Sequence, residues 1–307
     1  MTWRLAVVGF GKIARDQHLP AIAASGDFRL IATVDPHSAP SVEAPHFADL
    51  DSLLSSQIRF DAVAVCSPPQ SRYRLAAQAL NAGKHVLIEK PPCATLSEAQ
   101  ESARLAAEKG CTLYTAWHSR FAAGVAPARA WLEGKTLQSV TIDWREDVRV
   151  WHPGQKWIFE AGGFGVFDPA INALSIATAI LPRALLVDSG ELSVPANCDA
   201  PISGNIDMRD SAGISVRMEM DFLHEGQECW DIVVRTSEGD LVLSHGGSVM
   251  VTPEGREAGE DREYQGVYSA YADAIRSGRS DVDFAPLRLV ADAFLRARIR
   301  QAPEFHA

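Results

Sequence analysis

The chain contains 307 residues, enough for two domains, and its 47% hydrophobic and 22% charged residues are ordinary for a globular protein with a hydrophobic core. Its formal net charge of −10 argues against a nucleic-acid-binding protein, because phosphate contacts need a basic face. No apolar run of roughly 18 residues predicts a transmembrane helix, and the apolar N-terminal stretch leads into glycines rather than a signal-peptide cleavage site. Because the five cysteines are scattered and form no C-x-x-C pair, we expect a cytoplasmic protein with reduced thiols, no disulfide framework and no metal site.

The first apolar run, Arg4 to Val8, leads into a glycine motif. The motif has the pattern G-x-G-x-x-A and consists of Gly9, Phe10, Gly11, Lys12, Ile13 and Ala14. In a strand-to-helix turn the first glycine permits the tight turn, and the second lets the backbone approach a pyrophosphate. The small third residue lets the helix pack on the strand. Glycine turns between strands and helices are common, so the motif gains weight from the residues downstream of it.

The next apolar run, Phe28 to Val34, ends at Asp35, about 20 residues beyond the motif. At that distance an acidic side chain meets the ribose hydroxyls of the adenosine. Pro36 and His37 come next, and neither is the arginine that would accommodate a 2′-phosphate. These residues predict NAD as the cofactor, with NADP less favoured. The alternative interpretation is an ordinary acidic residue at a strand end.

Strands and helices continue to alternate up to about residue 120. We expect strands at 61–65, 85–89 and 111–116, separated by helices at 72–81 and 96–108. The alternation is typical of a doubly wound parallel sheet, the Rossmann fold, which binds ligands outside the carboxyl ends of its strands. Three segments at that edge are candidates to face cofactor and substrate: Ser67-Pro68-Pro69, Glu89-Lys90-Pro91 and Trp117-His118.

Lys90 is the most informative residue of this edge. It follows a buried strand and precedes two prolines, which restrict its freedom to move into solvent. Held there, its amine could hydrogen-bond a substrate hydroxyl or exchange a proton. The alternative interpretation is a surface lysine that merely follows a strand.

The pattern changes after residue 120, where we place the boundary between domains 1–120 and 121–307. A short helix at 127–133 is followed by strands at 137–150, 187–194, 214–222, 228–236 and 241–245. Strands in series predict an open, mostly antiparallel sheet, so the second domain is of the α+β class. Helices at 269–277 and 286–298 close the chain, and the last helix is a candidate to pack back on the first domain.

The stretch GGFGVFDPAINAL, from Gly162 to Leu174, places Asp168 and Asn172 four residues apart. That spacing puts both side chains on one face of a helix, and Asp168 before Pro169 fits the helix N-terminus. A carboxylate there can accept a proton, whereas an amide cannot exchange one at neutral pH. The segment therefore predicts both a helix start and part of an active site.

The second domain supplies an unusual set of aromatic and hydrogen-bonding side chains. A sugar pocket needs this mixture, because indole faces cover C–H patches of the ring while carboxylates and imidazoles bind its hydroxyls. We interpret Trp131 and Trp144 as core residues, which is the general alternative for any tryptophan. The pocket candidates are Glu146, Trp151, His152, Trp157 and Trp230.

Together these motifs carry a family resemblance. GFGKIARDQHLPAI, AGKHVLIEKPP and WIFEAGGFGVFDPAIN resemble the glucose-fructose oxidoreductase / inositol dehydrogenase family, Gfo/Idh/MocA, over most of the chain. The segments TAWHSRFA, EDVRVWHPGQKWI and DVDFAPLRLVADAF are similar to its bacterial aldose 1-dehydrogenases of D-galactose and L-arabinose. The resemblance implies NAD(P)-dependent oxidation of an anomeric hydroxyl to an aldonolactone, by a homodimer or homotetramer.

The resemblance also implies roles for individual residues. Because Asn172 cannot exchange a proton, proton transfer rests on Asp168 or Lys90, and Asp168 is the first choice for the base. Lys90 is then expected to orient the C1 hydroxyl, and Asn172 and His118 to bind hydroxyls. Further cofactor contacts are expected at Ser67, Pro68, Glu89, Lys90 and Trp157. Many family members carry a histidine where this chain has Asn172, and another in the segment where it has Arg72. A mechanism based on those histidines therefore does not apply to this chain.

Two alternatives remain open. Some relatives on this fold bind a dinucleotide as sensors or co-repressors without turnover, and others act on a different sugar or a cyclic polyol. Retention of both Lys90 and Asp168 favours the enzyme. Within that class, D-galactose is the expected substrate, with L-arabinose and D-fucose as co-substrates.

Overall fold

The structure, a computed structural model, describes residues 2–37 and 42–306. The chain forms two compact units. The N-terminal unit comprises Met1–His118 with Glu263–Phe284, and the C-terminal unit comprises Ser119–Arg262 with Ala285–Ala307. No helix in the described ranges is both long enough and apolar enough to cross a membrane.

The N-terminal unit contains a parallel sheet whose strand order is β3-β2-β1-β4-β5-β6, which confirms the predicted Rossmann-like fold. Its strands are β1 (Trp3–Val8), β2 (Phe28–Val34), β3 (His46–Phe47), β4 (Ala62–Val65), β5 (His85–Glu89) and β6 (Leu113–Ala116). All four residues of β4 and of β6 are buried, as is usual for strands covered on both faces. The chain order reverses between β1 and β4, and this reversal creates the crevice in which such sheets bind ligands.

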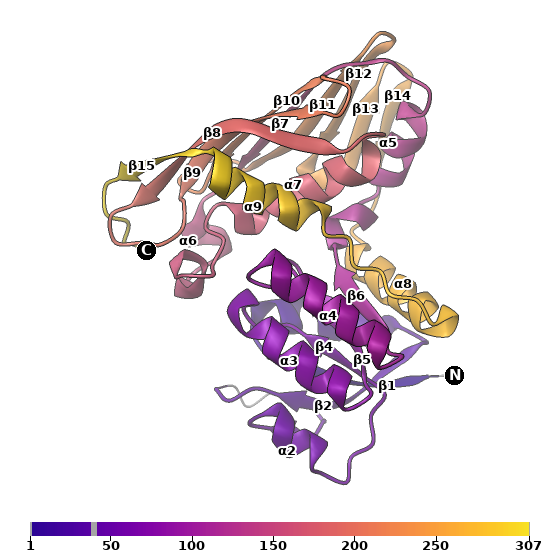
Figure 1. Cartoon of the computed structure of the whole chain (residues 1–307). Coiled ribbons are helices and arrows are strands. Elements are labelled where there is room, and N and C mark those ends of the chain that lie inside the picture. The colour runs from indigo at the N-terminus through magenta and orange to yellow at the C-terminus, as the bar shows by residue number, and fades with distance from the viewer. Residues whose placement is uncertain (1, 38–41, 307) are drawn as a thin grey trace. The chain divides into compact units, whose positions relative to one another are not determined.

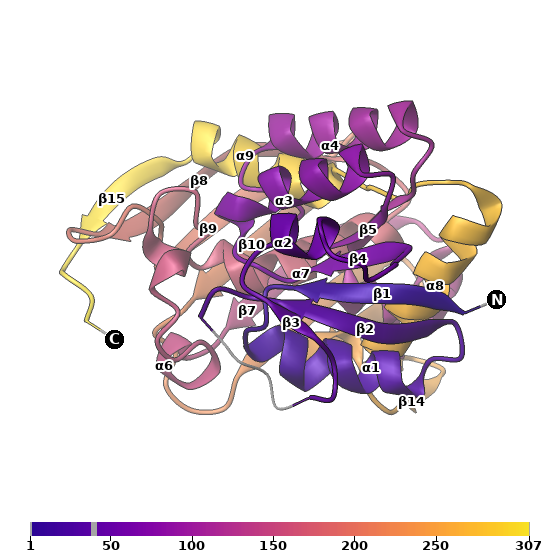
Figure 2. The same cartoon turned by 90° about the horizontal axis from the view of Figure 1, so that it is seen from below.

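Helices cover both faces of this sheet. Figure 2 shows α3 and α4 on one face and α1 on the other. The helices are α1 (Leu19–Ala24), which follows a π-helical turn at Ala14–His18, and α2 (Leu50–Leu54), α3 (Pro69–Asn81) and α4 (Leu96–Glu108). Thr95 and Glu98 form a capping box at the start of α4, so the helix begins where the sequence predicts.

The helix that returns to the N-terminal unit is α8 (Glu263–Ser277) and not the last helix, which corrects the expectation for the chain end. It also begins six residues before the predicted start at 269. Tyr264, Tyr268 and Tyr271 occur at helical spacing and are buried, and their rings pack against His18 and Phe28. This aromatic face is what binds α8 to its unit.

The C-terminal unit contains a nine-stranded sheet in the described part of the chain, with the order β14-β13-β12-β11-β7-β10-β9-β8-β15. Its strands are β7 (Leu137–Arg145), β8 (Leu185–Pro195), β9 (Ser203–Asp210), β10 (Ser215–Asp221), β11 (Cys229–Thr236), β12 (Gly239–Ser244), β13 (Val249–Thr252), β14 (Gly255–Ala258) and β15 (Arg298–Ala302). Most pairs are antiparallel, as predicted, but β7 pairs with β10 and β8 pairs with β15 in parallel.

One face of this sheet is covered by helices and the other is open. Figure 1 shows α7 (Phe167–Ile180) and α9 (Ala285–Arg296) lying along the covered face, whose core includes Ile206, Met218 and Leu289. Helix α5 (Val125–Leu132) packs on α7. Along β10 the residues alternate between buried apolar and more exposed polar side chains, so the open face is polar.

Two differences from the sequence prediction have physical causes. The strand expected to run to residue 150 ends at Arg145, because Asp147 caps a short helix, α6 (Val148–Trp151). Strands β9, β13, β14 and β15 were not predicted. The last two are exposed along almost their whole length and therefore carry little hydrophobic alternation.

A buried ion pair links the glycine-motif segment to β5. His18 Nε2 lies 3.0 Å from Glu89 Oε1, and the side chains are 0% and 2% exposed. Burial lowers the pKa of His18, but its contacts with Cys66 and Glu89 raise that pKa to about 10. Burial raises the pKa of Glu89, but the hydrogen bond and charge of His18 lower it to about 2. The pair is therefore charged across the neutral range.

We predict that this pair gives the unfolding free energy a defined pH dependence. The raised pKa of His18 contributes stability that is complete below pH 6.5 and is lost as the pH rises towards 10. The lowered pKa of Glu89 contributes stability that is complete above pH 4.5 and is lost as the pH falls towards 2. His18→Gln should cost about 3–5 kcal/mol near pH 6 and should remove the decline between pH 6.5 and 10.

Urea denaturation followed by circular dichroism across this pH range measures both effects. Arg104→Gln, which removes two exposed ion pairs on α4, is the control and should leave the profile unchanged. A His18→Gln protein that still lost stability in parallel with the parent above pH 6.5 would contradict the assignment.

Candidate functional site

The glycine motif lies at the carboxyl end of β1, beside the loop that follows β4. Gly9 has a φ of 89°, and a Cβ built on it would lie 2.6 Å from the backbone nitrogen of Ser67. Only glycine therefore fits there. Gly11 has no atom within 4 Å of such a Cβ, so its surroundings leave open space beside the backbone. This is the arrangement that lets a pyrophosphate approach the turn.

Asp35 is oriented by the same turn. Its two carboxylate oxygens accept hydrogen bonds of 2.7 Å from the backbone nitrogens of Phe10 and His37. The side chain of Phe10 is buried, so only its backbone can reach a ligand, whereas Lys12 is exposed and pairs with Asp16. Asp35 thus stands at the end of β2, beside the backbone of the glycine motif.

Lys90 follows β5 and precedes a cis peptide bond to Pro91. The Glu89 carboxylate accepts hydrogen bonds from the Lys90 backbone nitrogen at 2.9 Å and from the Tyr264 hydroxyl at 2.7 Å. Arg72 is buried and donates to the backbone oxygens of Ser67 and Pro91. Two buried charged groups therefore hold the backbone around Lys90.

His118 belongs to the N-terminal unit and contacts α8. Its Nδ1 pairs with the Glu263 carboxylate, and its ring stacks on Tyr264 with 5.2 Å between centroids. Glu263 and Tyr264 did not emerge from the sequence, because the helix prediction began only at residue 269. The spacing of the tyrosines along this segment was the signal that could have identified them.

Of the predicted sugar-pocket residues of the C-terminal unit, Trp151, His152 and Trp230 gather around Glu146, which lies just beyond the end of β7. Its carboxylate is 3% exposed and accepts hydrogen bonds from Trp230 Nε1 at 2.9 Å and His152 Nε2 at 3.0 Å. The other ring nitrogen of His152 lies 4.0 Å from Asp168 Oδ2, and Trp151 packs edge-on against Trp230. Residues from four separate segments therefore form one carboxylate, imidazole and indole cluster.

Asp168 and Asn172 share the first turns of α7. The helix begins at Phe167, so Asp168 lies inside the first turn, and the cap residue is Val166 without a side-chain cap. Asp168 is 4% exposed. Asn172 Oδ1 is buried and has no hydrogen-bond partner among the described residues. An unpaired buried acceptor is costly, which makes this atom a candidate for ligand contact.

The loop before α7 depends on glycine. A Cβ on Gly163 would lie 2.3 Å from the Trp157 carbonyl oxygen, and one on Gly165 would lie 2.1 Å from the Pro201 carbonyl oxygen. The glycines predicted to mark a turn therefore bring the Trp157 segment, a 3₁₀ turn at Lys156–Phe159, against the start of the helix.

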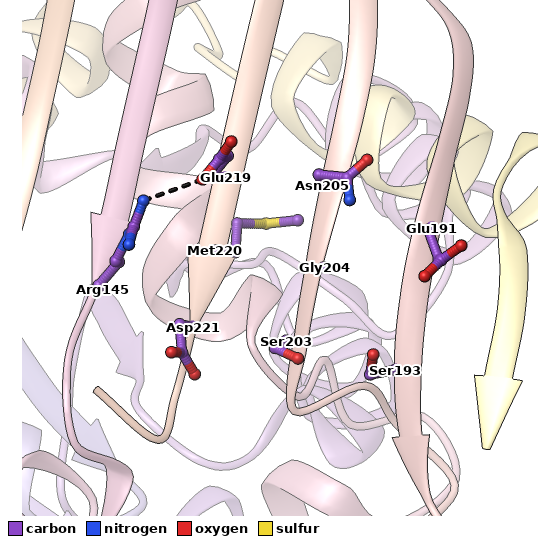
Figure 3. Close-up of a pocket in the computed structure, with 9 residues that line it drawn as sticks. All are labelled: Arg145, Glu191, Ser193, Ser203, Gly204, Asn205, Glu219, Met220 and Asp221. Carbon is purple, nitrogen blue, oxygen red and sulfur yellow. Dashed lines mark hydrogen bonds and ion pairs between the residues drawn. The ribbon is translucent and has the colours of Figure 1, made fainter. Parts of the chain in front are cut away.

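A separate hollow of about 280 Å³ lies on the open face of the C-terminal sheet (Figure 3). Arg145 and Glu219 form an ion pair of 2.9 Å across neighbouring strands at its edge. None of the site residues predicted from the sequence lines it. No cluster of histidine, cysteine, aspartate or glutamate in the described residues could hold a metal ion.

Comparisons with known proteins identify the family of the chain. Residues 3–117 match the GFO_IDH_MocA family, described as an oxidoreductase family with an NAD-binding Rossmann fold. The chain is 49% identical to galactose 1-dehydrogenase of Pseudomonas fluorescens over 293 residues. The matched stretch covers 95% of this chain and 94% of that protein.

Solved structures are similar to this chain over nearly its whole length. The crystal structure of D-galactose-1-dehydrogenase from Rhizobium etli has a TM-score of 0.94 at 46% identity, covering 99% of this chain and 98% of that one. A 3-ketoreductase from Actinomadura kijaniata, in complex with NADP and TDP-benzene, has a TM-score of 0.86 at 21% identity, covering 99% and 100% of the two chains. This second likeness is one of fold alone.

The two motif glycines should respond differently to substitution. Gly9→Ala should lower the unfolding free energy by about 1–3 kcal/mol, because the new Cβ meets the Ser67 backbone and a positive φ is strained. Gly11→Ala should retain the stability of the parent but raise the dinucleotide Kd at least ~10-fold, because the methyl group stands where the pyrophosphate approaches.

Chemical denaturation and calorimetric titration with the dinucleotide measure the two quantities. The pair serves as its own control, since both variants add one methyl group within the same turn. Equal stability of Gly9→Ala and the parent, or unchanged binding by Gly11→Ala, would contradict the proposed geometry.

Proposed function

Because the chain belongs to the Gfo/Idh/MocA family of oxidoreductases, as its motifs predicted, we propose that it is an NAD-dependent aldose 1-dehydrogenase. Its preferred substrate in this proposal is D-galactose, which it oxidises at C1 to the aldonolactone. The observation that carries the proposal is the carboxylate, imidazole and indole cluster beside Asp168. The identity of 49% with a galactose 1-dehydrogenase along nearly the whole chain supports the same substrate class.

The cluster suits a pyranose chemically. The indoles of Trp151 and Trp230 offer apolar faces for C–H patches of the ring. The buried acceptor Asn172 Oδ1 and the carboxylate of Glu146 can pair with ring hydroxyls. His118 is proposed to bind another hydroxyl, as the family resemblance implies.

Asp168 is the proposed base. Oxidation at C1 breaks the O–H and C–H bonds, and the electron pair leaves with the hydrogen of C1 as hydride. The Asp168 carboxylate would take the hydroxyl proton, because Asn172 cannot exchange one. Trp157, in the turn before α7, is proposed to contact the cofactor.

Lys90 is the proposed partner of the C1 oxygen. Its amine would donate a hydrogen bond and stabilise the negative charge that develops as the proton leaves. The clamp formed by Glu89 and Arg72 holds the backbone on both sides of Lys90, so the amine is carried on a restrained segment. Preorganised donors of this kind lose little free energy to reorganisation during the reaction.

The residues of the glycine motif fit a dinucleotide. Gly9 and Gly11 allow a close approach of the backbone, and Asp35, Ser67 and Pro68 stand along the same edge. Bound NAD would supply the hydride acceptor, C4 of its nicotinamide ring. Asp35 would pair with the ribose hydroxyls, and its negative charge would repel the 2′-phosphate of NADP.

The proposed substrate range rests on shared stereochemistry. D-galactose, L-arabinose and D-fucose have the same configuration at C1 to C4 and differ at C5. A pocket that reads those four positions accepts all three, because a single small group at C5 changes binding by only about 1–3 kcal/mol. We therefore propose L-arabinose and D-fucose as co-substrates.

The proposal also includes assembly as a homodimer or homotetramer. The resemblance to the family implies it, and the open face of the C-terminal sheet is the surface expected to take part.

Turnover should depend on both proposed reacting residues. Asp168→Asn and Lys90→Ala should each lower kcat at least ~100-fold, the usual scale for the loss of acid-base chemistry. Formation of the reduced cofactor, followed by absorbance with a panel of aldoses, measures turnover. Asp240→Asn and Lys109→Ala change exposed residues of the same types and should retain it.

The same panel tests the whole proposal. Near-parental kcat in either variant would remove that residue from the mechanism. Tight dinucleotide binding without turnover of any sugar would instead favour the sensor, and activity confined to inositols or dihydrodiols would favour a polyol dehydrogenase.

Cofactor preference should reside in Asp35. The parent protein should show a higher kcat/KM with NAD than with NADP. Asp35→Ser should reduce that ratio at least ~10-fold, because the repulsive charge is removed. Steady-state kinetics with each cofactor measure the ratio, and a parent protein that prefers NADP would overturn the assignment.

A further inference from the structure

His152 has a carboxylate at each ring nitrogen. Its Nε2 lies 3.0 Å from Glu146 Oε1, and its Nδ1 lies 4.0 Å from Asp168 Oδ2. The side chains of Glu146 and Asp168 are 3% and 6% exposed, whereas that of His152 is 19% exposed. The imidazole is thus the most exposed of three titratable groups in a row.

The orientation of the ring is determined by its neighbours. His152 ends α6, where its backbone nitrogen donates to the Val148 carbonyl oxygen at 2.8 Å, and its ring packs 5.6 Å from that of Phe222. Trp230 Nε1 donates to the other oxygen of Glu146, which immobilises the carboxylate that faces the imidazole. When the imidazole is neutral, Nε2 donates its proton to Glu146, so the lone pair of Nδ1 faces Asp168.

Asp168 itself has little access to solvent. In the proposed function it gains one proton in each turnover and must lose it before the next. Asn172, four residues along the same helix, cannot take that proton. The only other carboxylate in the cluster as the structure describes it, Glu146, is more deeply buried.

We propose that His152, oriented by Glu146, is a relay that carries the proton from Asp168 to solvent. This inference rests on the proposed function. After hydride transfer, the O–H bond of protonated Asp168 breaks and an N–H bond forms at Nδ1 of His152. The resulting imidazolium is paired with Glu146 through Nε2 and releases the Nδ1 proton to water, which returns both residues to their starting states.

The relay depends on the tertiary structure, because helix α7 itself carries no imidazole beside Asp168. Asn172, four residues along the same helix, exchanges no proton, and His152 brings an imidazole to the same aspartate from a different segment. A gap of 4.0 Å is too long for a hydrogen bond, but a movement of about 1 Å or one bridging water closes it. Catalytic hydrogen bonds commonly tighten in this way when substrate binds.

The test uses the full chain with D-galactose and NAD. His152→Gln and His152→Ala should lower steady-state kcat at least ~10-fold and the sugar KM in proportion, so that kcat/KM stays within about threefold of the parent value. Stopped-flow absorbance should then show a burst of one reduced cofactor per site, followed by slow turnover, because hydride transfer precedes the blocked step. Added imidazole should raise the kcat of His152→Ala in proportion to its concentration.

His224→Gln is the matched control, because His224 lies in the same unit, is exposed and bonds only the Gln227 carbonyl oxygen in the described structure. It should show parental kcat, no burst and no response to imidazole. Circular dichroism verifies folding, and if His152→Ala is unfolded, the burst in His152→Gln decides the question.

Three outcomes would overturn the relay. The first is a kcat within twofold of the parent in both variants, and the second is a reduced kcat with neither a burst nor imidazole rescue. The third is a raised KM at constant kcat, which would make His152 a hydroxyl-binding residue only. A parent protein that reduces NAD with no aldose would overturn the proposed function first, and that result is distinct from all three.

Discussion

Burial of the Glu89 carboxylate is the constraint on which the N-terminal unit depends. A carboxylate that is almost completely removed from water is tolerated only when charge and hydrogen bonds compensate it. His18 supplies the charge, and the Tyr264 hydroxyl and the Lys90 backbone supply donors. Burial and the charge of Glu89 raise the pKa of Tyr264 well above its ordinary value, so this phenol stays protonated and can donate. One side chain thereby ties the turn after the glycine motif, the end of β5 and the first turn of α8 together.

In the C-terminal unit the carboxylate of Glu146 is likewise buried and needs donors to compensate it. Here the donors are an indole and an imidazole, and the imidazole has a second nitrogen directed towards Asp168. The two carboxylates differ in the solvent exposure of their partners. The partners of Glu89 are sealed in the core, so that pair can only stabilise and position. His152 reaches solvent, so its carboxylate partner can also promote proton movement.

In the mechanism we propose, this contrast assigns the movement of the Asp168 proton to His152. A proton acceptor needs a route by which it regains its starting state, and residue 172 provides none once it is asparagine. The start of α7 keeps the carboxylate of Asp168 and gains a buried amide oxygen suited to a hydroxyl. Acid-base chemistry and substrate contact, which one histidine could combine, are divided between His152 and Asn172 in the mechanism we propose.

The sequence by itself determined the parallel sheet, the position of the glycine motif and the helix at Asp168, because these depend on local signals. Apolar runs, glycine turns and helical spacing act over a few residues and need no knowledge of distant partners. Only the tertiary structure decided that Tyr264 reaches Glu89 from 175 residues away and that His152 faces Asp168. It also assigned α8 to the N-terminal unit. Buried polar groups choose partners by proximity in the fold, and the spacing of residues along the chain carries no record of that choice.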